Sequence, residues 1–137
     1  DIILNKKKLG GILIESKIIQ KQPYVVIGIG INVNEASMAS TISNISTSIR
    51  INNDKINNIE LLCSSILNEL ELLYNSSEKK WIEKWNKNCI HQYSEVEFHK
   101  ENILEKGIFM RISKDGEAVI KINNIDRNFS SGIVELL

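Results

Sequence analysis

The first third of the chain contains two short apolar runs that predict neighbouring β-strands. Residues 9–15 and 24–33 are rich in β-branched side chains and are bounded by polar or turn-forming residues. The connection between them, Ser16 to Pro23, is polar and has about the length of a hairpin loop. We therefore expect two antiparallel strands that lie side by side.

The next segment, Glu35 to Asn58, has a different pattern. It is dense in Ser, Thr and Asn, and its isoleucines follow no long period. A long irregular segment inside a compact domain is usually functional or mobile. We expect one short helical turn within it, around Met38 to Ser43.

Two amphipathic helices are predicted next. Apolar residues recur at steps of three and four over roughly 58–75, where Asn57 or Asn58 can serve as the N-cap. A second helix is expected over roughly 77–90, with Ser77 as its cap. The helical spacing of Trp81 and Trp85 in the second helix favours packing over ligand stacking.

From Ser94 onward the pattern changes to short alternating runs, with a turn at 114–116. The predicted strands lie around Val96 and Phe98, and over 107–112, 118–122 and 132–136. Four or five short strands in about 44 residues predict a small β-barrel. The fold class is thus α+β, with a boundary near Gln92 to Ser94 that divides the chain into domains 1–92 and 93–137.

Composition narrows the classes of protein. The chain has 17 basic and 17 acidic residues, so charge gives no reason to expect a nucleic acid or a membrane surface as partner. The longest apolar stretch, Tyr24 to Val33, is too short to cross a bilayer. Cys63 and Cys89 lack metal-ligand spacing and are expected to be small buried thiols, which favours a reducing compartment, the cytoplasm.

Each of the first two strands places a strong polar group beside glycines. Lys8 precedes Gly10 and Gly11, and Asn32 follows Gly28 and Gly30. Glycine lets another molecule approach the backbone closely. From the pattern alone, Lys8 is better explained as a solvated surface lysine than as a functional one. For Asn32, a residue at which the strand ends and enters a turn is a common alternative.

Other chemistries find less support. The glycine pair at 28 and 30 lacks the third glycine and the following helix of a dinucleotide fingerprint. His91 and His99 have no Cys or carboxylate partners at ligand spacing, and no arrangement of a nucleophile with a histidine base is apparent.

Together, the strand Lys8-Leu9-Gly10-Gly11-Ile12-Leu13-Ile14-Glu15 and the strand Gly28-Ile29-Gly30-Ile31-Asn32 resemble a known family. In the catalytic domain of biotin protein ligases, a Lys-Leu-x-Gly-Ile-Leu-x-Glu strand and a Gly-x-Gly-Ile-Asn strand line the biotinyl-adenylate pocket. Asp1-Ile2-Ile3-Leu4 resembles the end of the family's Lys-Trp-Pro-Asn-Asp motif. The family's biotin-gripping loop of glycines and arginines lies upstream, so we expect a C-terminal piece that lacks half of the active site.

The resemblance implies a fold and roles for particular residues. The fold would be part of a class II synthetase-like biotin and lipoate ligase domain, an antiparallel sheet with helices, followed by a Src-homology-three-like barrel. Lys8 would be the catalytic cation and would also contact biotin. Biotin would be bound by Gly11, Ile12, Gly28 and Gly30, with Ile12 as an apolar wall. Asp1 and Asn32 would bind the adenylate, and Asp1 would also bind magnesium.

The implied activity is activation of biotin by ATP to biotinyl-5′-AMP, followed by transfer to a lysine of a biotin carboxyl carrier domain. The cofactors would be ATP, biotin and Mg²⁺. The partner would be the carrier domain of a biotin-dependent carboxylase, and a homodimer is one option for assembly. Two alternatives stay open: a lipoate or octanoate ligase, and a non-catalytic module that binds a carrier protein. One departure from the family is that Gly132 precedes an apolar C-terminus that lacks the family's arginine. Either the barrel contributes less to catalysis here, or Arg111 or Arg127 takes the place of that arginine.

Overall fold

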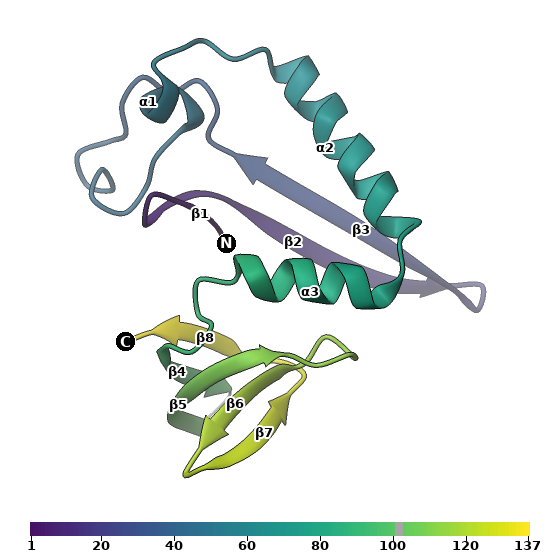
Figure 1. Cartoon of the computed structure of the whole chain (residues 1–137). Coiled ribbons are helices and arrows are strands. Elements are labelled where there is room, and N and C mark those ends of the chain that lie inside the picture. Colours follow the sequence, from purple (N-terminus) through teal and green to yellow (C-terminus); the bar gives the residue numbers. More distant parts are fainter. Residues whose placement is uncertain (101–102) are drawn as a thin grey trace. The chain divides into compact units, whose positions relative to one another are not determined.

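The computed structural model describes residues 1–100 and 103–137, which form two compact units, 1–67 and 68–137 (Figure 1). Two antiparallel sheets and three helices make up the described chain, which confirms the α+β class. The two compact units separate between residues 67 and 68, within the first long helix. This division does not test the domain boundary near residue 92, which stays a prediction. In the part of the chain that the structure describes, no helix is both long and apolar enough to cross a membrane.

The first unit is built on a three-stranded antiparallel sheet of order β1-β2-β3. Its strands are β1 (Ile2–Leu4), β2 (Lys7–Ile19) and β3 (Gln22–Ile31). The expected antiparallel pairing of the two long strands is confirmed, with Gly10 opposite Ile31 and Ile19 opposite Gln22.

The connection predicted over Ser16 to Pro23 is much shorter in the structure. Only Gln20 and Lys21 form the turn, with φ of 51° and 65°, the left-handed pair that joins two strands most directly. The residues on either side extend the strands. Pro23, which cannot donate to a ladder, is accommodated because β3 is an edge strand.

The segment between the sheet and the long helix contains hydrogen-bonded turns and one short helix. Around the predicted helical turn the chain forms turns, with Ile42 N donating to the Ala39 carbonyl at 2.9 Å. The helix lies further along, as α1 (Ile49–Asn53). Ser48 caps it by accepting a hydrogen bond from Ile51 N at 3.0 Å.

Both long helices are confirmed, as α2 (Ile59–Tyr74) and α3 (Glu78–Asn88). Asn58 caps α2, because its Oδ1 accepts a hydrogen bond from Leu61 N at 2.8 Å. Ser77 occupies the N-cap position of α3 without a capping bond from its side chain. The prediction that Cys63 is buried was wrong, since it lies on an exposed face of α2. Cys89 is partly buried, and this burial raises the pKa of its thiol.

The second sheet has five antiparallel strands in the order β7-β6-β5-β4-β8, which agrees with the predicted barrel. One strand escaped prediction, β7, because its five residues carry apolar side chains only at the two ends. The turn at 114–116 is confirmed by a hydrogen bond from Gly116 N to the Ser113 carbonyl at 3.0 Å. The strands are β4 (Glu95–Lys100), β5 (Ile103–Ile112), β6 (Ala118–Ile122), β7 (Ile125–Phe129) and β8 (Ile133–Leu136).

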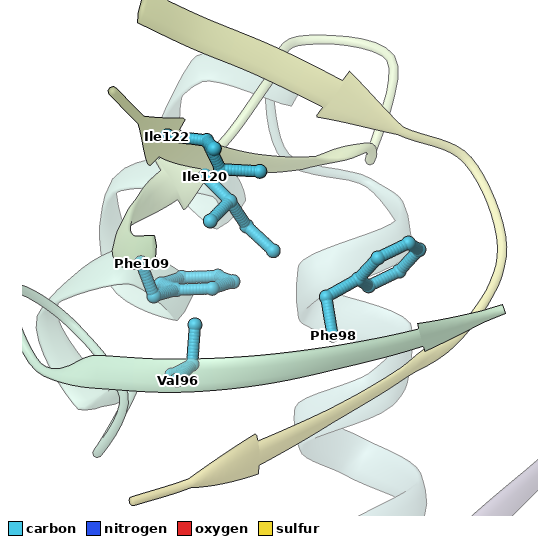
Figure 2. Close-up of a cluster of buried hydrophobic side chains, with 5 residues drawn as sticks. All are labelled: Val96, Phe98, Phe109, Ile120 and Ile122. Carbon is cyan, nitrogen blue, oxygen red and sulfur yellow. The ribbon is translucent and has the colours of Figure 1, made fainter. Parts of the chain in front are cut away.

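The hydrophobic core of the second unit lies inside this sheet (Figure 2). One side of Trp85 of α3 packs on the core, with its ring 6.2 Å from that of Phe109, which confirms the predicted packing contact, while 44% of its surface stays exposed. The Asn86 side chain also accepts a hydrogen bond from Ile112 N at 2.9 Å, which ties α3 to β5. The buried members of the core are Val96, Phe98, Phe109, Ile120 and Ile122.

Candidate active site on strands β1 to β3

Lys8 is held from both sides by the backbone. Its N–H donates to the Ile45 carbonyl at 2.8 Å, and its own carbonyl accepts from Thr47 N at 2.9 Å. On its other side Lys8 is paired with Ile3 of β1. The site therefore begins from a lysine whose main chain is fixed by two separate segments of the first unit, β1 and the stretch 45–47.

The side chain of Lys8 forms an ion pair with Asp1. The distance from Nζ to Asp1 Oδ1 is 2.8 Å, and the two side chains are 52% and 54% exposed. An ion pair this exposed contributes only about 0–1 kcal/mol to stability. The pair thus orients an ammonium group and leaves it accessible, which suits a role toward a ligand better than a role in folding.

A β-bulge directs this pair toward Gly11. Ile2 is opposite Gly10 and Ile3 is opposite Lys8, so β2 has one residue more than β1 at this point. Such bulges redirect side chains and are frequent beside active sites. A Cβ placed on Gly11 would lie 3.4 Å from Asp1 Oδ1, the same oxygen that contacts Lys8. Asp1, Lys8 and the open side of Gly11 therefore converge.

Three glycines lie on one face of the β2–β3 hairpin. Gly11 is directly opposite Gly30, and Leu13 is directly opposite Gly28, so all four residues share this face. A Cβ on Gly30 would meet nothing within 4 Å. We call this surface of Gly11, Gly28 and Gly30 the glycine face. It is bare backbone that begins beside the Lys8 and Asp1 pair.

Ile12 is not brought to the glycine face. The alternation of strand residues places it on the opposite face, across from Ile29. Leu13 stands on the glycine face instead, with 66% of its surface exposed. Sequence reasoning missed Leu13, although counting in steps of two from Gly11 would have found it.

Gly10 has a different role from the other glycines. It is buried, and a Cβ there would overlap the carbonyl oxygen of Gly30 and lie 3.1 Å from Ile31 Cα. The absence of a side chain at Gly10 thus lets β2 approach its own neighbour, β3. The glycines at 11, 28 and 30 leave space toward solvent.

We expect Gly10→Ala to destabilise the first unit by about 1–3 kcal/mol, because the added methyl group must displace the β3 backbone. Gly11→Ala, one residue along, should cost less, since its methyl group would meet only a side-chain oxygen at ordinary contact distance. Urea unfolding of both variants measures the difference. Equal losses of stability would contradict the separate role of Gly10.

Asn32 holds the segment that follows the sheet. Its Nδ2 donates to the Thr47 carbonyl at 3.0 Å, its N–H donates to Leu9 O at 2.9 Å, and its carbonyl accepts from Ile49 N at 3.0 Å. A contact between Asn32 and a phosphate, which would fall to its Oδ1, stays a prediction.

The anchored segment is the stretch Ser46 to Ser48, which is 0–9% exposed and consists entirely of hydroxyl residues. Buried hydroxyls need partners, and Ser48 Oγ donates to the Glu35 carbonyl at 2.6 Å. Sequence reasoning missed this anchor, because nothing in its polar composition indicates burial.

The two barrel arginines considered as substitutes for the family's C-terminal arginine are both paired. Arg111 Nη1 lies 3.4 Å from Asp126 Oδ2, and Arg127 Nη1 lies 3.0 Å from Glu105 Oε1. A catalytic part for either one stays a prediction.

Comparison with known proteins identifies the fold. Neither the protein-family models nor the curated proteins give a match to the sequence. Among solved structures, the apo form of biotin protein ligase from Aquifex aeolicus matches with a TM-score of 0.80 and 21% identity over 98% of this chain and 61% of that chain. The same enzyme in complex with biotin and ATP gives 0.75 and 24%, over 98% and 57% of the two chains.

The chain therefore has the fold of a biotin protein ligase, as the resemblance in the strand motifs implied. It covers 57–61% of the length of the ligase chains that it matches, as expected for a C-terminal portion. At these levels of identity the comparison establishes the fold, and the activity is a matter for proposal.

Proposed function

We propose that this chain is the C-terminal portion of a biotin protein ligase, which activates biotin with ATP and transfers it to a lysine of a biotin carboxyl carrier domain. The observation that carries the proposal is the exposed Lys8 and Asp1 pair at the end of the glycine face. The shared fold with a ligase solved in complex with biotin and ATP supports it.

In the first step the biotin carboxylate attacks the α-phosphorus of ATP, which gives biotinyl-5′-AMP and pyrophosphate. In the second step the carrier lysine attacks the carbonyl carbon of that anhydride, and AMP leaves. Negative charge develops on phosphate oxygens in the first step and on acyl and phosphate oxygens in the second. A fixed ammonium group beside the anhydride stabilises both, and Lys8 supplies it.

The glycine face supplies the surface against which the biotin ring lies. Without side chains on Gly11 and Gly30, a ligand can reach the backbone of both strands, and Leu13 adds an apolar edge. Ile12 stands behind this surface on the other face. The reacting carboxylate of biotin would then point toward Lys8.

Asp1 is the residue of this site that fits a magnesium ion. Mg²⁺ is commonly held by one or two carboxylates together with substrate phosphates and waters, and Asp1 offers one half-exposed carboxylate. Within the described residues, no group of three or more His, Cys, Asp or Glu side chains is arranged to hold a metal by itself. When bound, the ion would neutralise charge on the triphosphate.

The proposal is tested by labelling a carrier domain. The full-length gene product, incubated with ATP, Mg²⁺, biotin and a biotin carboxyl carrier domain, should transfer biotin to the carrier, as seen on a streptavidin blot. The 137-residue chain alone should be at least about a hundredfold slower, because misplaced substrates lose that much rate. Omission of ATP is the control.

Two outcomes would overturn this assignment. Full-length protein that labels the carrier with octanoate or lipoate instead of biotin would identify the related acyl ligase. Protein that binds the carrier without modifying it would identify the non-catalytic module. Rapid labelling by the 137-residue chain would contradict the expectation that the site needs further segments.

We also expect the segment 35–45 to order over the adenylate. Its side chains bury little apolar surface, whereas residues 46–48 are already fixed to Lys8 and Asn32. Hydrogen exchange of the full-length gene product, with and without biotinyl-5′-AMP, should show protection rising in 35–45 more than in α2. Unchanged exchange in 35–45 would mean that this segment takes no part in closing the site.

A cytoplasmic location remains a prediction from the sequence, and a homodimer remains one option for assembly. The proposed macromolecular partner is the carrier domain alone. The balanced charge of the chain, 17 basic and 17 acidic residues, gives no support for a nucleic acid bound through this segment.

A further inference from the structure

The second unit contains a cavity that the proposed ligase chemistry does not use. Its volume is about 280 Å³, and it lies among α3, the five-stranded sheet and the connection between β7 and β8. Small residues at 116, 118 and 130–132 provide the space. Its larger walls are aromatic, namely Trp85, Phe98, Phe109 and Phe129.

The aromatic walls are fixed by contacts with one another. The rings of Phe98 and Phe129 lie 4.0 Å apart, and Trp85 lies against Phe109. Phe98 and Phe109 are 1% and 3% exposed, and Figure 2 shows their side chains extending from the sheet into its interior. Because these two rings are almost fully covered, the part of the wall open to a ligand is formed by Trp85, which is 44% exposed, and the partly buried Phe129. The packing behind them holds this wall in place before any ligand arrives, as in most ligand sites.

Gly132 is required for this architecture. Its φ of 139° lies in the region that side chains disfavour, and a Cβ there would overlap the ring of Phe98. The connection between β7 and β8 can therefore lie directly on the aromatic wall. It brings the hydroxyl groups of Ser130 and Ser131 to the edge of the cavity.

No Asp, Glu, Lys or Arg is among the described residues that line the cavity. The one titratable side chain is His91, whose ring lies 5.9 Å from that of Phe109. Burial lowers the pKa of His91, so its imidazole is neutral at neutral pH. Phosphates and carboxylates would find no counter-charge here, whereas an uncharged ring would find aromatic walls and a few hydrogen-bonding groups.

We propose that this cavity is a binding site for an uncharged aromatic ring that carries one hydrogen-bonding group. The ring packs against the half-exposed Trp85 and the partly buried Phe129, and its polar group pairs with the His91 imidazole or a serine hydroxyl. The volume accommodates one ring system of this kind. The proposal does not depend on the ligase assignment.

Two sources could supply such a ring, a free small molecule or an aromatic side chain of a partner peptide. In the described sheet, β8 pairs only with β4, so its outer edge can accept an extended peptide beside the cavity. A comparison of the free ring with the same ring in a peptide separates the two sources.

Indole is the probe for the test, titrated into the ¹⁵N-labelled 137-residue chain. Saturable chemical-shift changes should be confined to the residues that line the cavity, with a dissociation constant of about 1 mM or lower, as expected for a ligand of this size. Indole-3-acetate, the same ring with a carboxylate, should bind at least about tenfold more weakly. No saturation by about 10 mM indole, or equal binding of indole-3-acetate, would overturn the proposal.

Ala118→Leu fills the cavity and should weaken indole binding at least about tenfold. Ala36→Leu, the same substitution on an exposed loop of the first unit, is the matched control and should bind as the unaltered chain does. Ser131→Leu, at an exposed lining residue, is a second filling variant should Ala118→Leu fail to fold in a thermal melt. Filling variants that bind indole as well as the control would overturn the proposal.

The source of the ring is read from a five-residue peptide of sequence Gly-Gly-Trp-Gly-Gly, blocked at both ends. Binding at least about tenfold tighter than that of indole supports a partner side chain whose backbone adds to β8. Binding no tighter than that of indole supports a free small molecule.

Discussion

Replacement of Lys8 by alanine should lower the rate of biotinyl-5′-AMP formation by the full-length gene product about 10²–10³-fold. The lysine is proposed to act on charge that develops only during the reaction, so its loss should reduce kcat more than it raises KM for biotin. The melting temperature should stay within about 2 °C, because the ion pair with Asp1 is half exposed and contributes little to folding. Biotin-dependent pyrophosphate exchange and a thermal melt on the same sample measure both effects.

Lys17→Ala is the matched control for this variant. Lys17 lies on the same strand, is exposed, and is opposite Tyr24 in the part of the hairpin beyond the glycine face. Its replacement should change neither exchange nor melting. Lys8→Arg should recover only part of the rate, because a guanidinium group has a different shape and donor geometry. If Lys8→Ala loses stability and exchange in parallel, Lys8 is a structural residue.

The elements that the sequence predicted well are those with a local period. The hairpin and α2 repeat their apolar residues over ten or more positions, and their capping and turn residues agree with that period. The elements that escaped prediction are too short to show one: α1 has five residues, and β7 is apolar only at its ends. Cys63 fits the helical period of α2 and is nevertheless exposed, because a period identifies a face and not what covers it.

The site shows the same division between local and non-local information. The motifs around Lys8 and Gly30 are local, and they were sufficient to select these residues as candidates for the site. The bulge that turns Lys8 toward Gly11 depends on how β2 pairs with β1, which no single strand encodes. The placement of Leu13 on the glycine face, and of Ile12 behind it, follows only once the register with β3 is known.

The bond from Asn32 to Thr47 gives the two halves of the site a common support. Thr47 also donates from its backbone to Lys8, so one segment contacts both the end of β3 and the catalytic candidate. A disturbance at Asn32 would therefore reach Lys8 through a single residue. This arrangement explains how an exposed lysine can be positioned without being buried.

Gly30→Val should weaken biotin binding by the full-length gene product and raise the dissociation constant for biotin at least about a hundredfold. The isopropyl group would stand on the glycine face, in space that nothing in the first unit occupies, and would exclude a ring from the backbone of β3. Folding should not suffer, because valine is favoured in strands and glycine in a strand costs roughly 0.5–1 kcal/mol. Isothermal titration with biotin and a thermal melt measure the two properties.

Ile29→Val is the matched control, since it places the same side chain one residue away on the opposite face of the hairpin. It should bind biotin as the unaltered protein does, because its side chain points away from the glycine face. If Gly30→Val binds biotin normally, the glycine face is not the biotin surface, and the role of Lys8 would have to be reassigned with it. If both variants lose binding equally, the effect comes from the hairpin as a whole, and the distinction between its two faces fails.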